Sequence, residues 1–237
     1  MMKGKDLDRI PTYVRGLDSK LQGGIPRGSI CLVCGLAGSM KSGFTYSVLW
    51  HASIDRGLKG MYITLEQRRD HILAQMEQMG MPQQNAKDLV VIDLTKLRKD
   101  LDKKKSSEVD WTGAILQSVE KYASTFGIDL FALDSLQALY ALQTFENPRN
   151  DVFNFFDALR DLGVTSYIIS EMSPDSDAHG FYGVEEFLCD GIVHLNVEHG
   201  KRAANLFLAV LKMRRCNHQR GYFPLLYDKG TFEIITD

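Results

Sequence analysis

Residues 29–42, SICLVCGLAGSMKS, place an apolar run, a short turn with two glycines and a Lys-Ser pair in direct succession. The run up to Cys34 is typical of a buried strand, and the residues after Lys41 favour a helix. A glycine-containing turn between a strand and a helix is the setting that a phosphate-binding loop requires. The segment therefore predicts a P-loop within an α/β fold.

The predicted P-loop supplies the groups that a nucleoside triphosphate needs. Backbone N–H groups of the loop and of the helix N-terminus would surround the β-phosphate. Lys41 would neutralise charge between the β- and γ-phosphates, and the hydroxyl of Ser42 would ligate Mg²⁺. The predicted ATP-binding residues of this loop are Gly35, Gly38, Ser39, Met40, Lys41, Ser42 and Gly43.

One position of the loop departs from the common pattern G-x-x-x-x-G-K-[ST], because Met40 occupies the place of the second glycine. Glycine there allows backbone angles and close approaches that methionine resists. We expect Gly38 and Ser39 to take up that conformational demand. The alternative interpretation is an ordinary strand–turn–helix that contains a Lys-Ser pair by chance.

Further strand-like runs alternate with helical patterns, which indicates βαβ units. The apolar runs are 29–34, 60–65, 89–94, 129–134 and 165–170. Nearly continuous apolar runs are typical of parallel strands covered on both faces. Closely spaced runs at the C-terminal end indicate antiparallel strands at one edge: IVHLNVE (192–198), NLFLAVLKM (205–213), YFPLLYD (222–228) and TFEIIT (231–236). We expect one domain, 1–237, with 1–10 as a flexible arm and helices flanking a mostly parallel sheet.

Two helices are predicted with defined apolar faces. The first buries one face made of Ile115, Leu116, Val119, Tyr122, Ala123 and Phe126. Asn147-Pro148 is typical of a helix start, with Asn as the N-cap and Pro at the first position. The helix that follows is expected to bury Val152, Phe153, Phe156 and Leu159.

Two of the predicted strands end in a carboxylate. Asp134 ends the apolar run IDLFALD, which is the Walker B pattern of a P-loop protein, and would hold Mg²⁺ indirectly through Ser42 or a water. Glu66 ends the strand that follows the P-loop helix, at the sheet edge where ligands of parallel sheets lie. A carboxylate there can deprotonate the attacking water. The alternative for Glu66 is a surface residue that caps the helix beginning near Arg68.

Composition limits the classes of function. The net charge of −2, from 28 basic and 30 acidic residues, excludes a global positive field that would hold nucleic acid. The start of the chain has no apolar stretch typical of a signal peptide, and no window approaches the roughly 18 apolar residues of a membrane span. We therefore expect a cytoplasmic protein that does not enter a membrane.

Two smaller features carry open interpretations. Cys31 and Cys34 form a C-x-x-C pattern, but residues three apart on a strand point to opposite faces, so we predict core cysteines rather than a metal or redox pair. The charged run 96–105, KLRKDLDKKK, is interpreted as a solvated loop or helix start. A phosphate-binding or partner-binding patch is the alternative.

Beyond these motifs, the chain resembles KaiC-like proteins, a branch of the RecA superfamily. The resemblance is collinear over about residues 10 to 235 and rests on GLDSKLQGGIPRG (16–28), the P-loop, YITLEQ (62–67), LDSLQAL (133–139), YGVEEFLCDGIVHL (182–195) and LKMRRCNH (211–218). It implies a RecA-like P-loop ATPase that binds ATP and Mg²⁺. It also implies a homo-oligomeric, hexameric ring that signals to a protein partner.

The resemblance assigns roles to single residues. Glu66 matches the family's general base, with Gln67 where a second Glu is common, and Asp134 matches the Walker B acid. A late segment matches residues that reach the neighbouring subunit's nucleotide: Lys212, Met213, Arg214, Cys216 and His218. Among these, Lys212 and Arg214 would stabilise the developing phosphoryl charge, whereas Cys216 replaces a common Thr. Without the resemblance, Lys212 and Arg214 are alternating residues on a solvated edge strand.

The same resemblance predicts which activity is missing. KaiC has one half that phosphorylates itself at adjacent Ser and Thr residues, whereas Glu186 and Phe187 stand at that position here. The chain therefore resembles the ATPase half, and autokinase activity is not expected. Two alternative functions are a RecA/RadA-like DNA-binding recombination ATPase, and an ATP-sensing switch with little hydrolysis, which Met40 and Gln67 favour.

Overall fold

The structure, a computed structural model, describes residues 8–95, 109–175, 178–200 and 204–236. Its strands are β1 (Arg9–Ile10), β2 (Val14–Arg15), β3 (Ile25–Pro26), β4 (Ile30–Gly35), β5 (Gly60–Thr64), β6 (Leu89–Asp93), β7 (Leu130–Asp134), β8 (Thr165–Glu171), β9 (Gly191–His199), β10 (Ala204–Met213), β11 (Tyr222–Asp228) and β12 (Thr231–Ile234). Its helices are α1 (Leu17–Lys20), α2 (Lys41–Arg56), α3 (Arg69–Gln78), the 3-10 turn η1 (Gln83–Asn85), α5 (Trp111–Phe126), α6 (Leu136–Leu142), α7 (Pro148–Asp161) and α8 (Glu185–Leu188).

A single large sheet organises the described residues, with its strands in the order β2-β12-β11-β10-β9-β4-β8-β7-β5-β6. The pairs from β4 to β6 are all parallel, as the alternation of strands and helices predicted. Antiparallel pairs join β9 to β10, β10 to β11 and β11 to β12. The predicted fold class, a mostly parallel sheet with antiparallel strands toward one side, is confirmed.

The direction of β9 differs from the expectation. The run IVHLNVE was expected among the antiparallel additions, but β9 pairs parallel with β4. The reason lies in the connection, because the chain passes from the end of β8 through α8 to the opposite end of the sheet, where β9 begins with Gly191 beside Cys31 of β4. A crossover of this kind gives a parallel pair.

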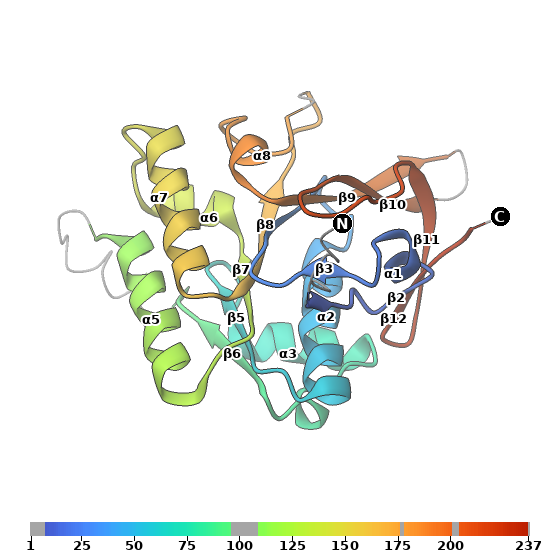
Figure 1. The fold of residues 1–237 in the computed structure, drawn as a ribbon, viewed down its shortest axis with the longest axis horizontal. Coiled ribbons are helices and arrows are strands. Elements are labelled where there is room, and N and C mark those ends of the chain that lie inside the picture. The colour runs from blue at the N-terminus through green and yellow to red at the C-terminus, as the bar shows by residue number, and fades with distance from the viewer. Residues whose placement is uncertain (1–7, 96–108, 176–177, 201–203, 237) are drawn as a thin grey trace, which may run out of the picture.

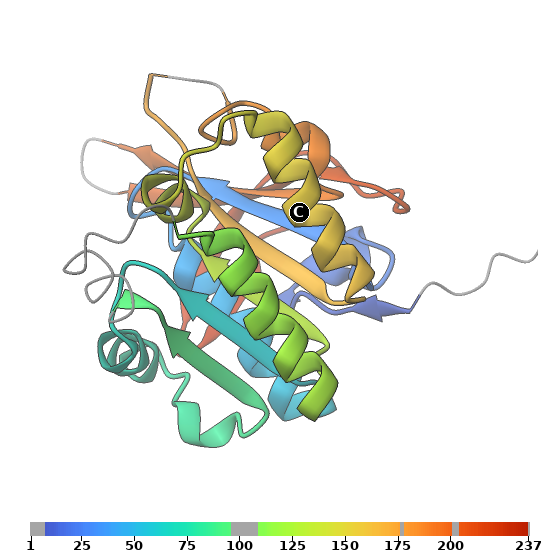
Figure 2. The same ribbon diagram turned by 90° about the vertical axis from the view of Figure 1, so that its left-hand side faces the viewer.

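Helices cover the sheet on both faces, so its central strands are buried throughout (Figures 1 and 2). On one side α2 and α3 pack against the sheet in one apolar cluster, and on the other α5, α6 and α7 pack in a second. Cys31 belongs to the first cluster and Cys34 to the second, as predicted for opposite faces of one strand. Among the described residues, no group of three or more His, Cys, Asp or Glu side chains is placed to hold a metal ion.

Helix α7 begins as its sequence predicts but buries a different phenylalanine. The side chain of Asn147 accepts a hydrogen bond from the backbone N–H of Asn150, and Pro148 follows the cap. The expected burial of Phe153 is wrong, since its side chain is 46% exposed, whereas Phe155 is 2% exposed. With Phe155 the buried stripe has the i, i+3, i+4, i+7 spacing of one helical face: Val152, Phe155, Phe156 and Leu159.

Other expectations about the helices and termini are corrected in part. Helix α5 buries Ile115 and Val119, but Phe126, the last residue of the helix, is exposed and packs on the partly buried ring of Tyr122. Arg9 and Ile10, the last residues of the predicted arm, pair with Pro26 and Ile25 of β3. Residues 1–7 and the charged run 96–105 lie outside the described residues. Within the described ranges, no helix has both the length and the apolar character needed to cross a membrane.

The two phenylalanines of α7 give a matched test of the fold. We expect Phe155→Ala to lower the free energy of unfolding by about 3–5 kcal/mol, because it removes a buried ring from the second cluster. Phe153→Ala should change it by less than about 1 kcal/mol, since half-exposed side chains contribute little. Urea unfolding followed by circular dichroism measures both. Equal destabilisation by the two variants would contradict the burial of Phe155.

Candidate nucleotide-binding site

The P-loop leaves the sheet at its centre. Strand β4 ends at Gly35, the loop covers the next residues, and α2 begins at Lys41. Gly35 lies opposite Glu171 in the pairing with β8, and the backbone N–H of Met172 donates to the Gly35 carbonyl at 3.1 Å. The start of the loop is therefore fixed by the end of β8.

Gly35 has to be a glycine for steric reasons. A Cβ atom at this position would lie 2.2 Å from the carbonyl oxygen of Leu195 on β9 and 2.5 Å from Oγ of Ser39. Backbone atoms cannot retreat from such a contact without separating β4 from β9. The first glycine of the motif thus allows the loop to turn tightly against its neighbouring strand.

Met40 adopts the conformation that the motif usually gives to glycine. Its φ of 66° and ψ of 23° lie in the left-handed region, and it is the N-cap residue of α2. The expectation that Gly38 and Ser39 would take up this demand is wrong, because Gly38 is also left-handed, at φ 81°, and does not relieve Met40. The partly buried Met40 side chain packs on the first apolar cluster, which helps to hold this conformation.

Lys41 lies among carboxylates at the edge of the sheet. Its Nζ donates to the carbonyl oxygens of Gly35, at 3.0 Å, and Leu36, at 2.9 Å. Burial lowers the pKa of Lys41, and the negative charges of Glu171, Asp134 and Glu66 oppose that shift. The ammonium group is therefore folded back onto the loop, within the electrostatic reach of three acids.

Asp134 lies at the end of β7, buried beside α2. The hydroxyl groups of Tyr62 and Ser42 both hydrogen-bond to its carboxylate. Burial raises the pKa of Asp134, while the hydrogen bonds from Tyr62 and Ser42 and the charge of Lys41 oppose the rise. A hydroxyl and a carboxylate in contact form an oxygen donor set of the kind that Mg²⁺ prefers.

The loop also fits the phosphates of a nucleotide. The hydroxyl of Ser39 is buried and has no hydrogen-bond partner among the described residues. No side chain caps the N-terminus of α2, and its first turn contains no acidic residue. Helix N-terminal N–H groups without a side-chain cap favour an anion. These groups would hold the phosphates, while Ser42 and Asp134 would hold Mg²⁺.

Glu66 lies just beyond β5, at the same edge of the sheet. Thr64 on β5 is paired with Asp134 on β7, and the backbone N–H of Leu65 donates to the Asp134 carbonyl. The side chain of Glu66 is exposed, and α3 begins only after Arg68. The structure thus brings Glu66, Asp134 and the P-loop to one edge, as the sequence predicted.

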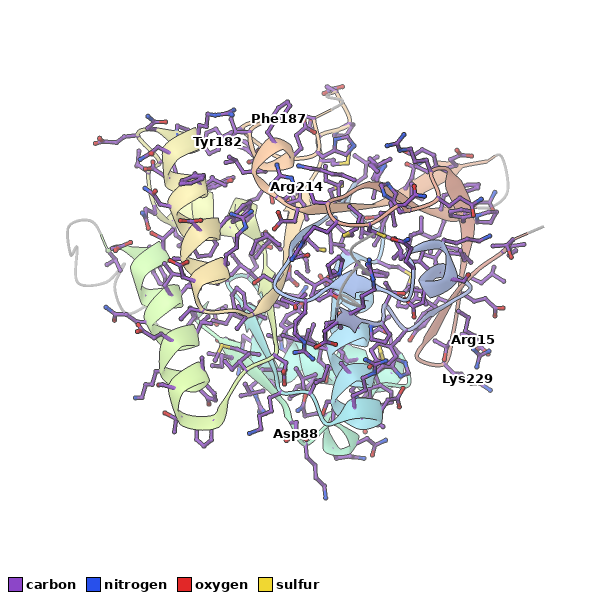
Figure 3. All side chains as sticks on the ribbon, in the orientation of Figure 1. Arg15, Asp88, Tyr182, Phe187, Arg214 and Lys229 are labelled. Atoms are coloured by element: carbon purple, nitrogen blue, oxygen red, sulfur yellow. The ribbon has the colours of Figure 1, made fainter. Side chains whose placement is uncertain are left out.

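Lys212 and Arg214 lie away from the P-loop of their own chain. Met213 pairs with Gly191, which pairs with Cys31 at the beginning of β4, whereas the P-loop follows the end of that strand. Lys212 and Arg214 both contact the C-terminal end of α8, and Figure 3 shows Arg214 beside Phe187. Within one chain these cations do not meet the phosphate loop.

The contacts of these two cations are specific. Nζ of Lys212 donates to the carbonyl oxygens of Glu186, at 2.8 Å, and Cys189, at 2.7 Å. Arg214 donates to Oδ1 of Asp190 at 3.2 Å and to the Phe187 carbonyl at 3.1 Å. Cations at a helix C-terminus satisfy its last carbonyl groups. Both residues therefore stabilise α8 in this chain.

The remaining predicted residues of the late segment surround one surface pocket of about 490 Å³. Its lining residues are Leu211, Lys212, Met213, Arg214, Cys216, Asn217, His218 and Arg220. Nε2 of His218 is buried without a hydrogen-bond partner among the described residues. Sγ of Cys216 lies 3.3 Å from the Leu21 carbonyl oxygen. The segment thus forms a basic pocket, separate from the P-loop.

Glu171 was not among the site residues predicted from the sequence. This residue ends β8, the strand beside the P-loop strand, and Gln137 holds its backbone on both sides. A signal was present, because Glu171 follows a predicted strand as Glu66 and Asp134 do. Three neighbouring strand ends therefore carry an acid at this edge.

The conformation of Met40 can be tested with a pair of variants that both remove its side chain. We expect Met40→Gly to be more stable than Met40→Ala by about 1 kcal/mol, because only alanine strains a left-handed backbone. Urea unfolding measures the difference. If alanine is as stable as glycine, the residue does not hold a left-handed conformation in solution.

Comparisons with known proteins agree with this geometry. A family model described as "ATPase: KaiC" matches residues 10–237. The circadian clock protein KaiC3 of Synechocystis sp. is 30% identical over 222 residues, which cover 92% of this chain and 43% of that protein. The circadian clock oscillator protein KaiC of Picosynechococcus sp. is 26% identical, over 98% of this chain and 45% of that protein. The chain thus spans less than half the length of these relatives.

A solved structure shows the same fold. The crystal structure of a KaiC-like protein from the hyperthermophilic archaeon Pyrococcus horikoshii OT3 superimposes with a TM-score of 0.82, over 97% of this chain and 100% of that one. The sequence identity between the two is 19%, so this likeness concerns the fold alone. The family match over residues 10–237 is the evidence for kinship. The chain belongs to the KaiC family of ATPases and has its RecA-like fold.

Proposed function

We propose that this protein is a slow, Mg²⁺-dependent ATPase whose active site is shared between subunits of a homo-oligomeric ring, and that it acts as a regulatory protein with a protein partner. The observation that carries the proposal is the position of Lys41, whose ammonium group lies on the phosphate loop within the electrostatic reach of three acidic strand ends. Fold membership alone would not assign an activity.

The residues at the sheet edge would have different roles in hydrolysis. Lys41 would leave the carbonyl oxygens of Gly35 and Leu36 to contact the β- and γ-phosphates. Ser42 and Asp134 would hold Mg²⁺, which supplies charge neutralisation at the phosphates when bound. Glu66 would accept a proton from the water that attacks the γ-phosphorus. The bond between that phosphorus and the β,γ-bridging oxygen would break, and its electron pair would stay on the departing ADP.

The proposal of a shared site rests on the separation of Lys212 and Arg214 from the P-loop of their own chain. Lys212 and Arg214 lie beyond the opposite end of β4 from their own P-loop, and no other late basic residue was predicted for that role. The side chain of Arg214 is 51% exposed, so part of it is accessible to a second chain. A cation supplied by a neighbouring subunit is a recurrent element of phosphoryl transfer. A ring would therefore place Lys212 and Arg214 of one subunit beside the phosphates of the next.

Glu186 and Phe187 stand at the position where one half of KaiC phosphorylates itself. These two residues argue against autokinase activity in this chain. The carboxylate of Glu186 contacts Nδ1 of His179 at 2.7 Å, and neither Glu186 nor Phe187 carries a hydroxyl that could accept a phosphoryl group. We therefore expect no stoichiometric gain of phosphate when the protein is incubated with Mg-ATP.

Glu66 gives the first test of the catalytic assignment. Glu66→Gln should keep ATP binding and lower the hydrolysis rate by roughly 10²-fold, the usual contribution of a positioned base. Glu77→Gln, an exposed glutamate on α3, is the matched control and should turn over normally. Single-turnover assays with Mg-ATP measure both. Unchanged turnover in Glu66→Gln would remove its role as the base, and tight ATP binding without turnover by the unmodified protein would favour an ATP-sensing switch.

Mixed rings test the shared site. Lys41→Ala should lose most of its ATP affinity, because it removes the positive charge that attracts the phosphates. Arg214→Ala should bind ATP but turn over about 10³-fold or more slowly. Co-assembled, the two inactive variants should regain part of the activity, since one interface in the mixture pairs an intact loop with an intact arginine. Circular dichroism controls for folding, because Arg214 also binds Asp190. Mixed rings without recovery would rule out sharing.

A further inference from the structure

A second pocket, of about 430 Å³, lies between α6 and the segment that follows β8. Its lining residues are Gln137, Tyr140, Ala141, Glu171, Met172, Ser173, Phe181 and Tyr182. The volume is in the range of pockets that bind small ligands. This pocket shares Glu171 with the nucleotide edge but contains no residue of the P-loop.

Three aromatic rings form one wall of the pocket. The ring centroid of Tyr182 lies 4.7 Å from that of Tyr140 and 5.0 Å from that of Phe181, and each pair packs edge to face. Phe181 is 68% exposed, so an apolar surface of this wall faces solvent. Aromatic faces attract cations as well as apolar groups. The wall thus offers contact area and a weak negative potential.

A buried carboxylate holds this wall in place. Glu185 is fully buried and accepts hydrogen bonds from the Tyr140 hydroxyl at 2.9 Å, the Tyr182 backbone N–H at 3.1 Å and the Val184 backbone N–H at 3.0 Å. Tyr140 also packs edge to face on Phe145. The two tyrosines are therefore fixed before any ligand arrives, which reduces the entropy lost on binding.

The lining of the pocket carries one negative charge. Among the lining residues, Glu171 is the one with a charged side chain, and no lysine or arginine contributes to the lining. Gln137 fixes the position of Glu171, because its amide accepts from the Glu171 N–H at 2.8 Å and donates to the Glu171 carbonyl at 3.0 Å. A carboxylate beside aromatic rings favours a cation and disfavours an anion.

We propose that this pocket binds an organic cation, a guanidinium or alkylammonium group on a short apolar chain. The apolar chain packs on Phe181 and Tyr182, and the charged group pairs with Glu171. The proposal goes beyond ATP hydrolysis and does not depend on it. Because Glu171 is paired with Gly35 and acts on Lys41, an occupant of the pocket also changes the electrostatics of the nucleotide edge.

Two probes of equal shape test the proposal. Butylguanidinium and butylurea differ in charge, and their binding to the nucleotide-free protein can be measured by saturation-transfer NMR titration. We expect saturable binding of butylguanidinium, about tenfold tighter than that of butylurea. Glu171→Gln should bring the two affinities close together, because it removes the charge but keeps the shape of the side chain.

Matched aromatic variants locate the site. Phe181→Ser should weaken both probes, whereas Phe187→Ser, also an exposed phenylalanine but outside the lining, should leave both unchanged. Both residues are mostly exposed, so neither change threatens folding. Figure 3 shows Tyr182 and Phe187 toward the same end of the molecule, which makes Phe187 a nearby control.

Two further ligands distinguish the source of the cation. Tighter binding of N-acetylarginine amide than of agmatine would indicate an arginine side chain of a protein, and the reverse would indicate a free polyamine-like molecule. Equal affinity of butylguanidinium and butylurea for the unmodified protein, or no saturable binding of either, would overturn the proposal. Both results are independent of ATP turnover, so they leave the proposed ATPase activity untouched.

Discussion

The hydrogen bonding of β4 between β8 and β9 fixes the geometry of everything else at the candidate site. Both edges of this strand are paired and both faces are buried, so Gly35 has a fixed position against Leu195 and Glu171. The order β4-β8-β7-β5 then sets Glu171, Asp134 and Glu66 at increasing distance from the loop. A parallel sheet collects the ends of its strands at one edge, and here the three successive strands on one side of the P-loop strand, β8, β7 and β5, each end at or near an acid.

The three cations assigned to the shared site all donate hydrogen bonds to backbone carbonyl groups. Lys41 rests on the loop's own carbonyl oxygens, and Lys212 and Arg214 on those at the end of α8. Asp190 links Arg214 to Arg160 and also accepts from the backbone N–H of Ile30, at the start of the P-loop strand. The Asp190 carboxylate therefore connects the basic late segment to β4. A partner that displaces Arg214 from Asp190 would also disturb the strand that leads into the P-loop.

Local patterns predicted the strands well because apolar runs of parallel strands are long and end abruptly. The start of α7 at Asn147-Pro148 was equally visible, since capping is a local interaction. The expected burial of Phe153 was wrong for a local reason. Phe155 completes the i, i+3, i+4, i+7 face with Val152, Phe156 and Leu159, so the helical period of the sequence already favours it. The left-handed backbone of Met40 follows from its place in the motif, but the apolar packing of its side chain is a tertiary contact that motif spacing does not contain. Likewise, Glu171 follows a predicted strand, but its pairing with Gly35 could not be predicted from spacing.

The pairing of β4 also has a consequence for how the chain acquires its structure. Its partners come from far downstream, at Ser166–Glu171 and Gly191–His194. Contacts between distant segments form slowly, because the entropy of closing a long loop is lost before the contacts are gained. While the chain emerges from the ribosome, the apolar P-loop strand has two unpaired edges until β8 has been made and one unpaired edge until β9 has been made. Edges of this kind promote aggregation, so the interval before β9 appears is when a nascent chain would depend most on chaperones.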